Sequence, residues 1–214
     1  MTIKPRGSDL LVCHNKRRRR LYRELLRDGR FFELLLKVDE EKSEQVHLGG
    51  CPRCRGPLHA AHFGRKPRGL LAGHQALPGG HEVRFDWCCG WCRQRTLPAS
   101  VRFLDRKVYV AVAIAVATVL MRGRDRGAVR VLRRELGASW STLRRWCRWW
   151  QALTGSAFWE RLRGKLPVDL DGGALPGSLL DRFEGCSAER MLGLLRLLAS
   201  GDRSDFPSAL AGSR

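Results

Sequence analysis

Acidic residues are scarce in this chain. Of its 214 residues, 21 are Asp or Glu and 40 are Lys or Arg, which gives a formal net charge of +19. Only seven of the basic residues are Lys, so Arg dominates. A GC-rich genome can raise the ratio of Arg to Lys, but it does not cause a shortage of acids. Because guanidinium groups pair with phosphates and stack on bases, the imbalance favours nucleic acid as a partner over an anionic membrane surface or an acidic protein.

Long hydrophobic runs are also missing. Residues 108–121 form the longest one, with 14 residues and Thr118 among them, whereas a helix that spans a bilayer needs about 20. Residues 1–9 contain no apolar segment of the signal-peptide type. We therefore expect a soluble cytoplasmic protein, associated with the nucleoid and not with a membrane. The hydrophobic share of 43% is enough for a packed core, which excludes full-length disorder.

The eight cysteines are too few for a disulfide scaffold in a chain of this length. Four of them form two CxxC pairs, Cys51 with Cys54 and Cys89 with Cys92, in a stretch rich in Gly and Pro. Two such turns, supported by neighbouring glycines, can direct four thiolates at one tetrahedral Zn²⁺. Buried inert cysteines and a redox pair are the alternatives. Cys88 could replace Cys89 as a ligand, although the spacing of Cys89 matches the first pair.

A zinc ion held by four thiolates keeps no open coordination position, so it is expected to stabilise the fold rather than to catalyse a reaction. Histidines of the same stretch could each replace a thiolate, but we expect them to be solvated loop side chains: His59, His62, His74 and His81. The remaining cysteines are expected to pack as small apolar groups: Cys13, Cys147 and Cys186.

Composition divides the chain into four segments. Residues 1–50 carry a basic run at 16–20 and two apolar helical patterns that end at Gly49 and Gly50, which predicts an α-helical hairpin. Residues 51–98 predict the short strands and turns of a zinc ribbon. Residues 99–165 predict a helix-turn-helix domain, and residues 166–214 predict a turn-rich link, a helix over about 188–198 and a flexible tail. The expected fold is mainly α with a small zinc-ribbon β element.

Residues 129–146 fit a helix-turn-helix. With Gly137 in the turn, apolar side chains occupy the positions where the two helices must pack: Leu132, Leu136, Leu143 and Trp146. Ser139 is a candidate N-cap for the second helix. Arg133 departs from the pattern, because that position is usually small. Residues 109–121 would supply a third helix; their alternation of β-branched residues with Ala also suits a strand, but their length favours a buried helix.

The second of these helices would present a basic face to double-stranded DNA. Its candidate contact residues are Trp140, Ser141, Arg144, Arg145 and Arg148. An Arg on this face can bind guanine bidentately or bind phosphate. Contacts to the DNA backbone are expected from Arg122, Arg124 and Arg126, and from Arg65, Lys66 and Arg68 between the Cys pairs. Solvated charged faces without a ligand are the alternative.

The basic residues are concentrated in the same parts of the chain. Residues 101–165 contain fifteen basic and four acidic residues, and residues 51–98 contain eight and two. This distribution predicts one continuous surface that faces nucleic acid. Aromatic residues near and beyond the end of the second helix are expected in the core rather than against bases: Trp146, Trp149, Trp150, Phe158 and Trp159.

A zinc ribbon that ends in residues 92–100 (CRQRTLPAS), followed by a basic helix-turn-helix, resembles the front end of insertion-sequence transposases over about residues 51–155. The resemblance implies that both modules recognise the terminal DNA of the element. The ribonuclease-H-like catalytic core of that family, with three carboxylates that bind two metals, has no counterpart, because Asp169, Asp171 and Asp181 lie in no strand pattern.

We therefore expect a DNA-binding protein of a mobile element that is not itself an enzyme. It would act beside a separate transposase or as a homo-oligomer. A host transcription regulator and an RNA-binding zinc-ribbon protein, reading RNA through residues 16–20, are the alternatives. A transposase or nuclease is the alternative in which the chain is an enzyme.

Overall fold

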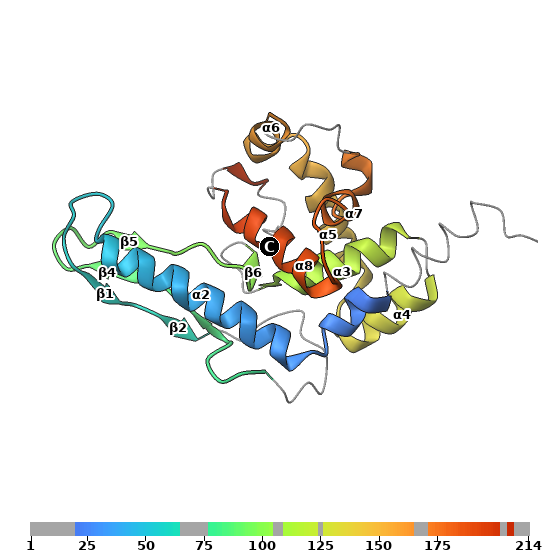
Figure 1. Ribbon diagram of the computed structural model, residues 1–214, viewed down its shortest axis with the longest axis horizontal. Helices are drawn as coiled ribbons and strands as arrows, with labels where there is room; N and C mark the ends of the chain where they lie inside the picture. Colours follow the sequence, from blue (N-terminus) through green and yellow to red (C-terminus); the bar gives the residue numbers. More distant parts are fainter. Residues whose placement is uncertain are drawn as a thin grey trace, which may run out of the picture.

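Helices make up most of the computed structural model, which describes residues 20–64, 77–104, 109–123, 126–164, 171–201 and 205–207. Three small antiparallel sheets accompany them, so the expected mainly α class is confirmed. Figure 1 shows the strands of residues 58–64 and 87–96 (β1, β2, β4 and β5) beside one long helix toward one end of the molecule, the strand of residues 103–104 (β6) in the middle, and the other helices gathered toward the opposite end.

The long helix is α2, which spans Gly29–Gly49. Residues 20–25 are also helical, and the chain turns before Asp28, whose side chain caps α2 by accepting a hydrogen bond from the Arg30 N–H at 3.0 Å. Gly50 follows α2 with a φ of 69°, a conformation that Gly adopts without strain, and α2 ends there as expected.

Two of the small sheets lie along α2 (Figure 1). One has the strand order β1-β4-β5, with β4 (Trp87–Cys89) between β1 (Leu58–Ala60) and β5 (Arg95–Thr96). The other pairs β2 (Phe63–Gly64) with β3 (Val83–Arg84). Strands of two or three residues contribute few ladder hydrogen bonds, so these sheets need support from outside.

Part of that support comes from α2. The indole of Trp87 stacks on the His47 ring at a centroid distance of 4.2 Å and donates a hydrogen bond to Ser43 Oγ at 3.1 Å. Trp87 and Leu58 also pack with Cys51 and Cys89 in a small core that is separate from the main core. We call residues 50–64 and 87–100 the four-cysteine module.

A buried ion pair fastens the middle of α2. Asp39 and Arg102 are 1% and 0% exposed, and Arg102 Nε lies 2.8 Å from Asp39 Oδ2. The Ser100 hydroxyl donates to the same carboxylate, and Arg102 also donates to the carbonyl oxygens of His81 at 2.7 Å and Val83 at 2.9 Å. A fully buried guanidinium is costly unless its donors are used, and here one cation joins α2 to β3 and to the chain just before it.

The central helix is α3 (Ala111–Arg122). It is buried on every side over Ala111–Thr118 and packs against α4 (Arg126–Glu135), α5 (Trp140–Leu153) and α8 (Ser187–Ala199). The helix expected at residues 109–121 is thus confirmed. It begins two residues later because Tyr109 and Val110 form β7, which pairs with β6 (Phe103–Leu104) in a hairpin that the sequence pattern did not predict.

Around α3, the aromatic side chains of α5 and α6 (Ala157–Arg163) are buried as expected: Trp146, Trp149, Trp150, Phe158 and Trp159. A short 3-10 turn, η1 (Gly172–Ala174), and α7 (Gly177–Leu180) lead to α8, which covers the helix expected at about 188–198. Among the described residues, no helix combines the length and apolarity needed to cross a bilayer.

Candidate metal centre and basic helix pair

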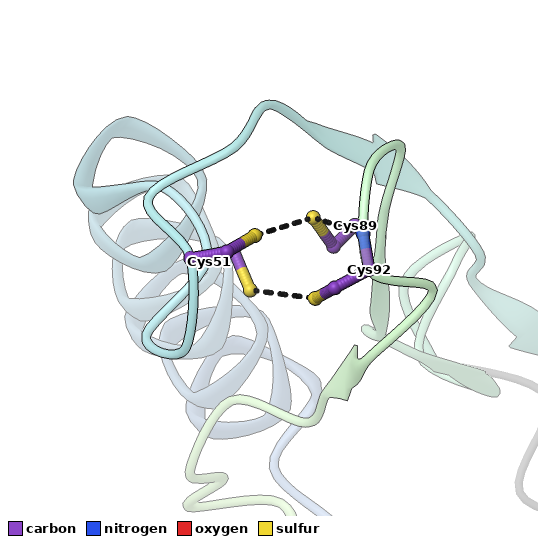
Figure 2. Close-up of side chains that lie close together, drawn as sticks. Cys51, Cys89 and Cys92 are labelled. Carbon is purple, nitrogen blue, oxygen red and sulfur yellow. Dashed lines mark hydrogen bonds between the residues drawn. The ribbon is translucent and has the colours of Figure 1, made fainter.

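The two CxxC pairs meet at one point. The sulfur atoms of Cys51, Cys54, Cys89 and Cys92 all lie within 4.8 Å of one another. Figure 2 shows Cys51 pointing from one turn toward Cys89 and Cys92 on the other. The Cys51 and Cys92 sulfurs are 3.5 Å apart, and those of Cys54 and Cys89 are 3.4 Å apart. Four sulfurs at about 2.3 Å from a tetrahedral Zn²⁺ would be about 3.8 Å apart, so this cluster has the size of such a site.

The two turns have the same backbone conformation. In each, the residue after the second Cys donates its N–H to the carbonyl of the first: Arg55 to Cys51 at 2.8 Å, and Arg93 to Cys89 at 3.1 Å. Arg55 and Arg93 both have a φ of 60°, so the left-handed residue that each turn requires is Arg and not the neighbouring Gly that we expected.

The neighbouring glycines serve a different purpose, which is close approach. A Cβ at Gly56 would lie 2.8 Å from the indole of Trp91, and a Cβ at Gly90 would lie 2.8 Å from His59 Nε2. Each glycine therefore makes room for a side chain of the opposite Cys turn or its adjoining strand, which lets the two turns come together.

The thiols of the cluster differ in acidity. The backbone N–H of Cys92 points at the Cys89 sulfur at 3.5 Å and lowers the pKa of Cys89 to about 6. The backbone N–H of Cys54 likewise lowers the pKa of Cys51. The backbone N–H of Gln94 also lowers the pKa of Cys92. Burial and the other three thiols have a larger opposite effect, so the pKa of Cys92 rises to about 12. A bound cation would remove this conflict, because it stabilises all four thiolates together.

Cys88 does not belong to the cluster. It precedes Cys89 in β4, and because neighbours in a strand point to opposite faces, its half-buried thiol lies away from the other sulfurs. The structure thus places Cys89, and not Cys88, with the other three sulfurs. No histidine joins the four sulfurs among the residues that the structure describes. His59 and His62 are exposed, with His62 Nδ1 2.8 Å from the Asp86 carbonyl oxygen; His74 lies outside the described residues.

The expectation of a solvated His81 is wrong. His81 is 0% exposed, lies 5.2 Å from the Phe32 ring centroid, and has no hydrogen-bond partner for either ring nitrogen among the described residues. Burial, and secondarily the charge of Arg102, lower its pKa to about 4. Sequence spacing could not reveal this, because His81 follows two glycines and resembles a loop residue.

Acid should therefore weaken the fold through His81. The folded pKa of about 4 lies below the ordinary value of 6.5, so the stability tied to neutral His81 is fully present above pH 6.5 and is lost as the pH falls towards 4. The loss amounts to about 3 kcal/mol. Urea unfolding of the wild type and of His81→Phe between pH 7 and pH 4 should show a smaller decline in the variant; equal declines would contradict this assignment.

The two lone cysteines that the structure describes have different environments. Cys147 is half-buried and donates to the Met121 sulfur at 3.5 Å, and burial raises its pKa, consistent with a packed residue. Cys186 is exposed at the N-cap of α8, where it borders an open pocket of about 510 Å³, so the expected packing is wrong there. Cys186 is exposed because the N-cap of a helix is a polar position at the surface. Cys13 lies outside the described residues.

The α4–α5 pair is joined by a tight turn. Gly137 has a φ of 59°, and the Ser139 side chain accepts a hydrogen bond from the Thr142 N–H at 3.1 Å, which caps α5. The apolar residues expected at the packing positions are all buried: Leu132, Leu136, Leu143 and Trp146. Arg133 lies to the side of this contact, with its guanidinium carbon 5.4 Å from the Trp140 ring centroid, which explains how a large residue is accommodated.

Of the eleven residues expected to contact DNA, the structure describes seven, and five of these are exposed. Exposed ones are Trp140, Ser141, Arg144, Arg148 and Arg126, whereas Arg145 and Arg122 are half-buried. Arg124, Arg65, Lys66 and Arg68 lie outside the described residues.

Two further exposed cations, Arg130 and Arg134, continue from Arg126 along α4. The spacing of four residues places Arg126, Arg130 and Arg134 on one face of α4. This pattern is present in the sequence, but only Arg126 was among the predicted DNA contacts. The one carboxylate of α4 and α5, Glu135, is bound by two arginines that precede α2: Arg23 at 2.6 Å, and Arg27. The exposed charge of this pair is therefore purely basic.

The four-cysteine module and α4 lie at opposite ends of the molecule (Figure 1). In the described part of the chain, the two basic regions thus do not form the single continuous surface that we expected. Comparisons with protein families, with curated proteins and with solved structures find no match to this chain.

Proposed function

We propose that this chain is a DNA-binding protein of a mobile genetic element, in which a zinc ribbon stabilises one end and a basic helix-turn-helix binds duplex DNA at the other. The observation that carries the proposal is the basic face of α4 and α5. Five of its arginines are exposed, and its one carboxylate is already paired. Such a face suits a phosphate backbone, because each contact releases a condensed counterion.

In this proposal α5 is the recognition helix. Ser141 and Arg144 of its first two turns face solvent, and α3, which also packs against α4, supports it from the buried side. Arg144 and Arg148 are one turn apart on the exposed face, where each could bind guanine O6 and N7 in the major groove. Ser141 and Trp140 would contact the same groove at the N-terminus of α5.

Helix α4 would contact the DNA backbone. Arg126, Arg130 and Arg134 form a line about two turns long on its exposed face, which suits a row of phosphates and fixes the register of α5. Arg122, at the end of α3, would add a contact at the edge of this line.

The four-cysteine module would hold one Zn²⁺ as a structural ion. Four thiolates fill a tetrahedral shell, so the proposal contains no catalytic step at this metal. The link to a mobile element depends on the order of a ribbon and a basic helix pair over residues 51–155, which resembles the front end of insertion-sequence transposases. A separate transposase, or a second copy of this chain, would be the protein partner.

Replacing Arg144 and Arg148 with Ala should reduce affinity for a duplex selected by the wild type from random sequences. Each arginine that reads a base is expected to contribute about 5- to 150-fold in Kd, and an arginine that binds phosphate instead should, when removed, lower the salt dependence of binding. Fluorescence anisotropy over a range of salt concentrations measures both effects. The matched control is Arg196→Ala, which removes an exposed helical arginine of α8.

Equal weakening by the Arg196 variant would mean that only net charge matters and would overturn specific recognition by α5. Preferential binding of single-stranded RNA, abolished when residues 16–20 are neutralised, would favour the RNA-binding alternative. A unique duplex without flanking inverted repeats in the genome would favour the host regulator.

A further inference from the structure

A tryptophan is exposed on the second Cys turn of the four-cysteine module. Trp91 lies between Cys89 and Cys92 in the second turn and is 71% exposed, although Trp is among the residues that gain most from burial. Neither the zinc ribbon nor the helix pair of the proposed function requires an aromatic residue here.

The indole of Trp91 lies against Gly56 of the first Cys turn. A Cβ built at Gly56 would lie 2.8 Å from Cδ2, 2.8 Å from Cε3 and 3.0 Å from Cγ of the ring. These near-equal distances place Gly56 against one face of the indole rather than against its edge. The opposite face accounts for the exposure, so the first Cys turn supports a flat aromatic surface that the second turn presents to solvent.

The surroundings of this surface are basic. Arg53, Arg55 and Arg93 are exposed on the same two turns, and none of them forms an ion pair with a carboxylate in the part of the chain that the structure describes. Residues 51–64 and 87–100 contain no Asp or Glu at all. An anion that approaches Trp91 therefore meets three cations and no carboxylate of the module itself.

We propose that Trp91 and these three arginines bind an unpaired nucleotide of DNA, with the base stacked on the open indole face and its flanking phosphates paired with Arg53, Arg55 or Arg93. Stacking on an aromatic platform inside a basic surface is how proteins bind single strands without reading their sequence. The inference rests on the proposed function for the duplex, and it specifies the substrate as duplex DNA with a single-stranded extension.

The open ring face favours an unpaired base over the other anionic ligands. Inside an intact duplex both faces of each base are covered by its neighbours, so away from the duplex ends only an unstacked base can use the indole. An acidic peptide could pair with the arginines but would leave the indole face unused.

The test compares a blunt duplex with the same duplex carrying a short single-stranded extension that contains 2-aminopurine. The wild type should bind the extended DNA more tightly and quench the 2-aminopurine. Trp91→Ala should lose about 5- to 150-fold in affinity for the extended DNA, together with the quenching, and should bind the blunt duplex as the wild type does. Trp91→Phe, which keeps an aromatic face, should recover part of both effects.

Leu48→Ala is the matched control, because Leu48 is a 78% exposed apolar residue at the end of α2 that adjoins the four-cysteine module. This variant should leave both affinity and quenching unchanged. Gly56→Ala should displace the indole and reduce quenching while the metal content stays unchanged. Equal weakening of blunt and extended DNA by Trp91→Ala, or no preference for the extension in the wild type, would overturn the inference. Loss of duplex binding on changing Arg144 and Arg148 is measured separately, so the proposed function can fail while the Trp91 site holds, and the reverse.

Discussion

Cys51→Ser is expected to abolish metal binding and to unfold the four-cysteine module. The separate core of this module consists of four buried residues: Cys51, Leu58, Trp87 and Cys89. Its strands have two or three residues each, so hydrophobic burial cannot offset the conformational entropy of ordering them. A structural zinc ion would supply the difference, since such ions bind zinc-finger peptides with about 10–16 kcal/mol.

The measurement combines metal analysis with hydrogen exchange. The wild type should contain one Zn²⁺ per chain, and the amides of β1, β4 and β5 should be protected. In Cys51→Ser the metal should be absent and these amides should exchange rapidly, while those of α3 stay protected because α3 belongs to the main core.

Cys88→Ser is the matched control. It changes the same chemical group one residue from Cys89, but its sulfur lies outside the cluster, so both metal content and protection should be unchanged. Retention of zinc and of protection in Cys51→Ser would refute the structural metal site, and loss of both in Cys88→Ser would show that the ligand set is wrong.

Asp39→Asn is expected to destabilise the whole protein by about 3–5 kcal/mol, the typical cost of leaving one partner of a buried ion pair uncompensated. The substitution keeps the shape of the side chain but removes the charge that neutralises Arg102, which has no contact with solvent. It also removes the best acceptor for the Ser100 hydroxyl and the Val101 N–H, the latter at 2.7 Å.

Urea unfolding of wild type and variant at neutral pH measures the difference. Glu160→Gln is the matched control, because it makes the same change from carboxylate to amide in an exposed pair, 3.9 Å from Arg163. Exposed pairs contribute about 0–1 kcal/mol, so this control should unfold almost as the wild type does. Similar effects of the two substitutions would mean that burial of the Asp39 pair does not matter to stability.

Local sequence signals predicted much of this structure. The spacing of the CxxC pairs identified all four members of the cluster, which contains Cys89 and not Cys88. Gly137 and Ser139 marked the turn and the cap between α4 and α5, because a left-handed residue and an N-cap each have a strong residue preference. The length and apolarity of residues 109–121 likewise predicted the buried helix α3.

Features that depend on distant contacts could not be predicted in this way. Asp39 and Arg102 are 63 positions apart, and each resembles a surface charge in its own segment. His81 is buried by side chains from α2 and β6, which no local pattern brings together. Tyr109 and Val110, which were predicted to begin the helix, pair with β6 instead. Strand pairing depends on the partner strand and not on propensity alone.

Helix α2 sets a fixed distance between the two ends of the molecule. Its 21 residues, at about 1.5 Å each, span about 30 Å. The start of α2 adjoins the arginines that bind Glu135 of α4, its middle is held by Arg102, and its end is stacked on Trp87, so the helix cannot pivot freely. Along B-DNA, 30 Å corresponds to about nine base pairs, slightly less than one helical repeat of about 10.5. A duplex lying parallel to α2 would therefore present nearly the same side at both ends of the helix, and in the proposed complex the single-stranded extension at Trp91 would lie close to one turn from the groove that α5 would read.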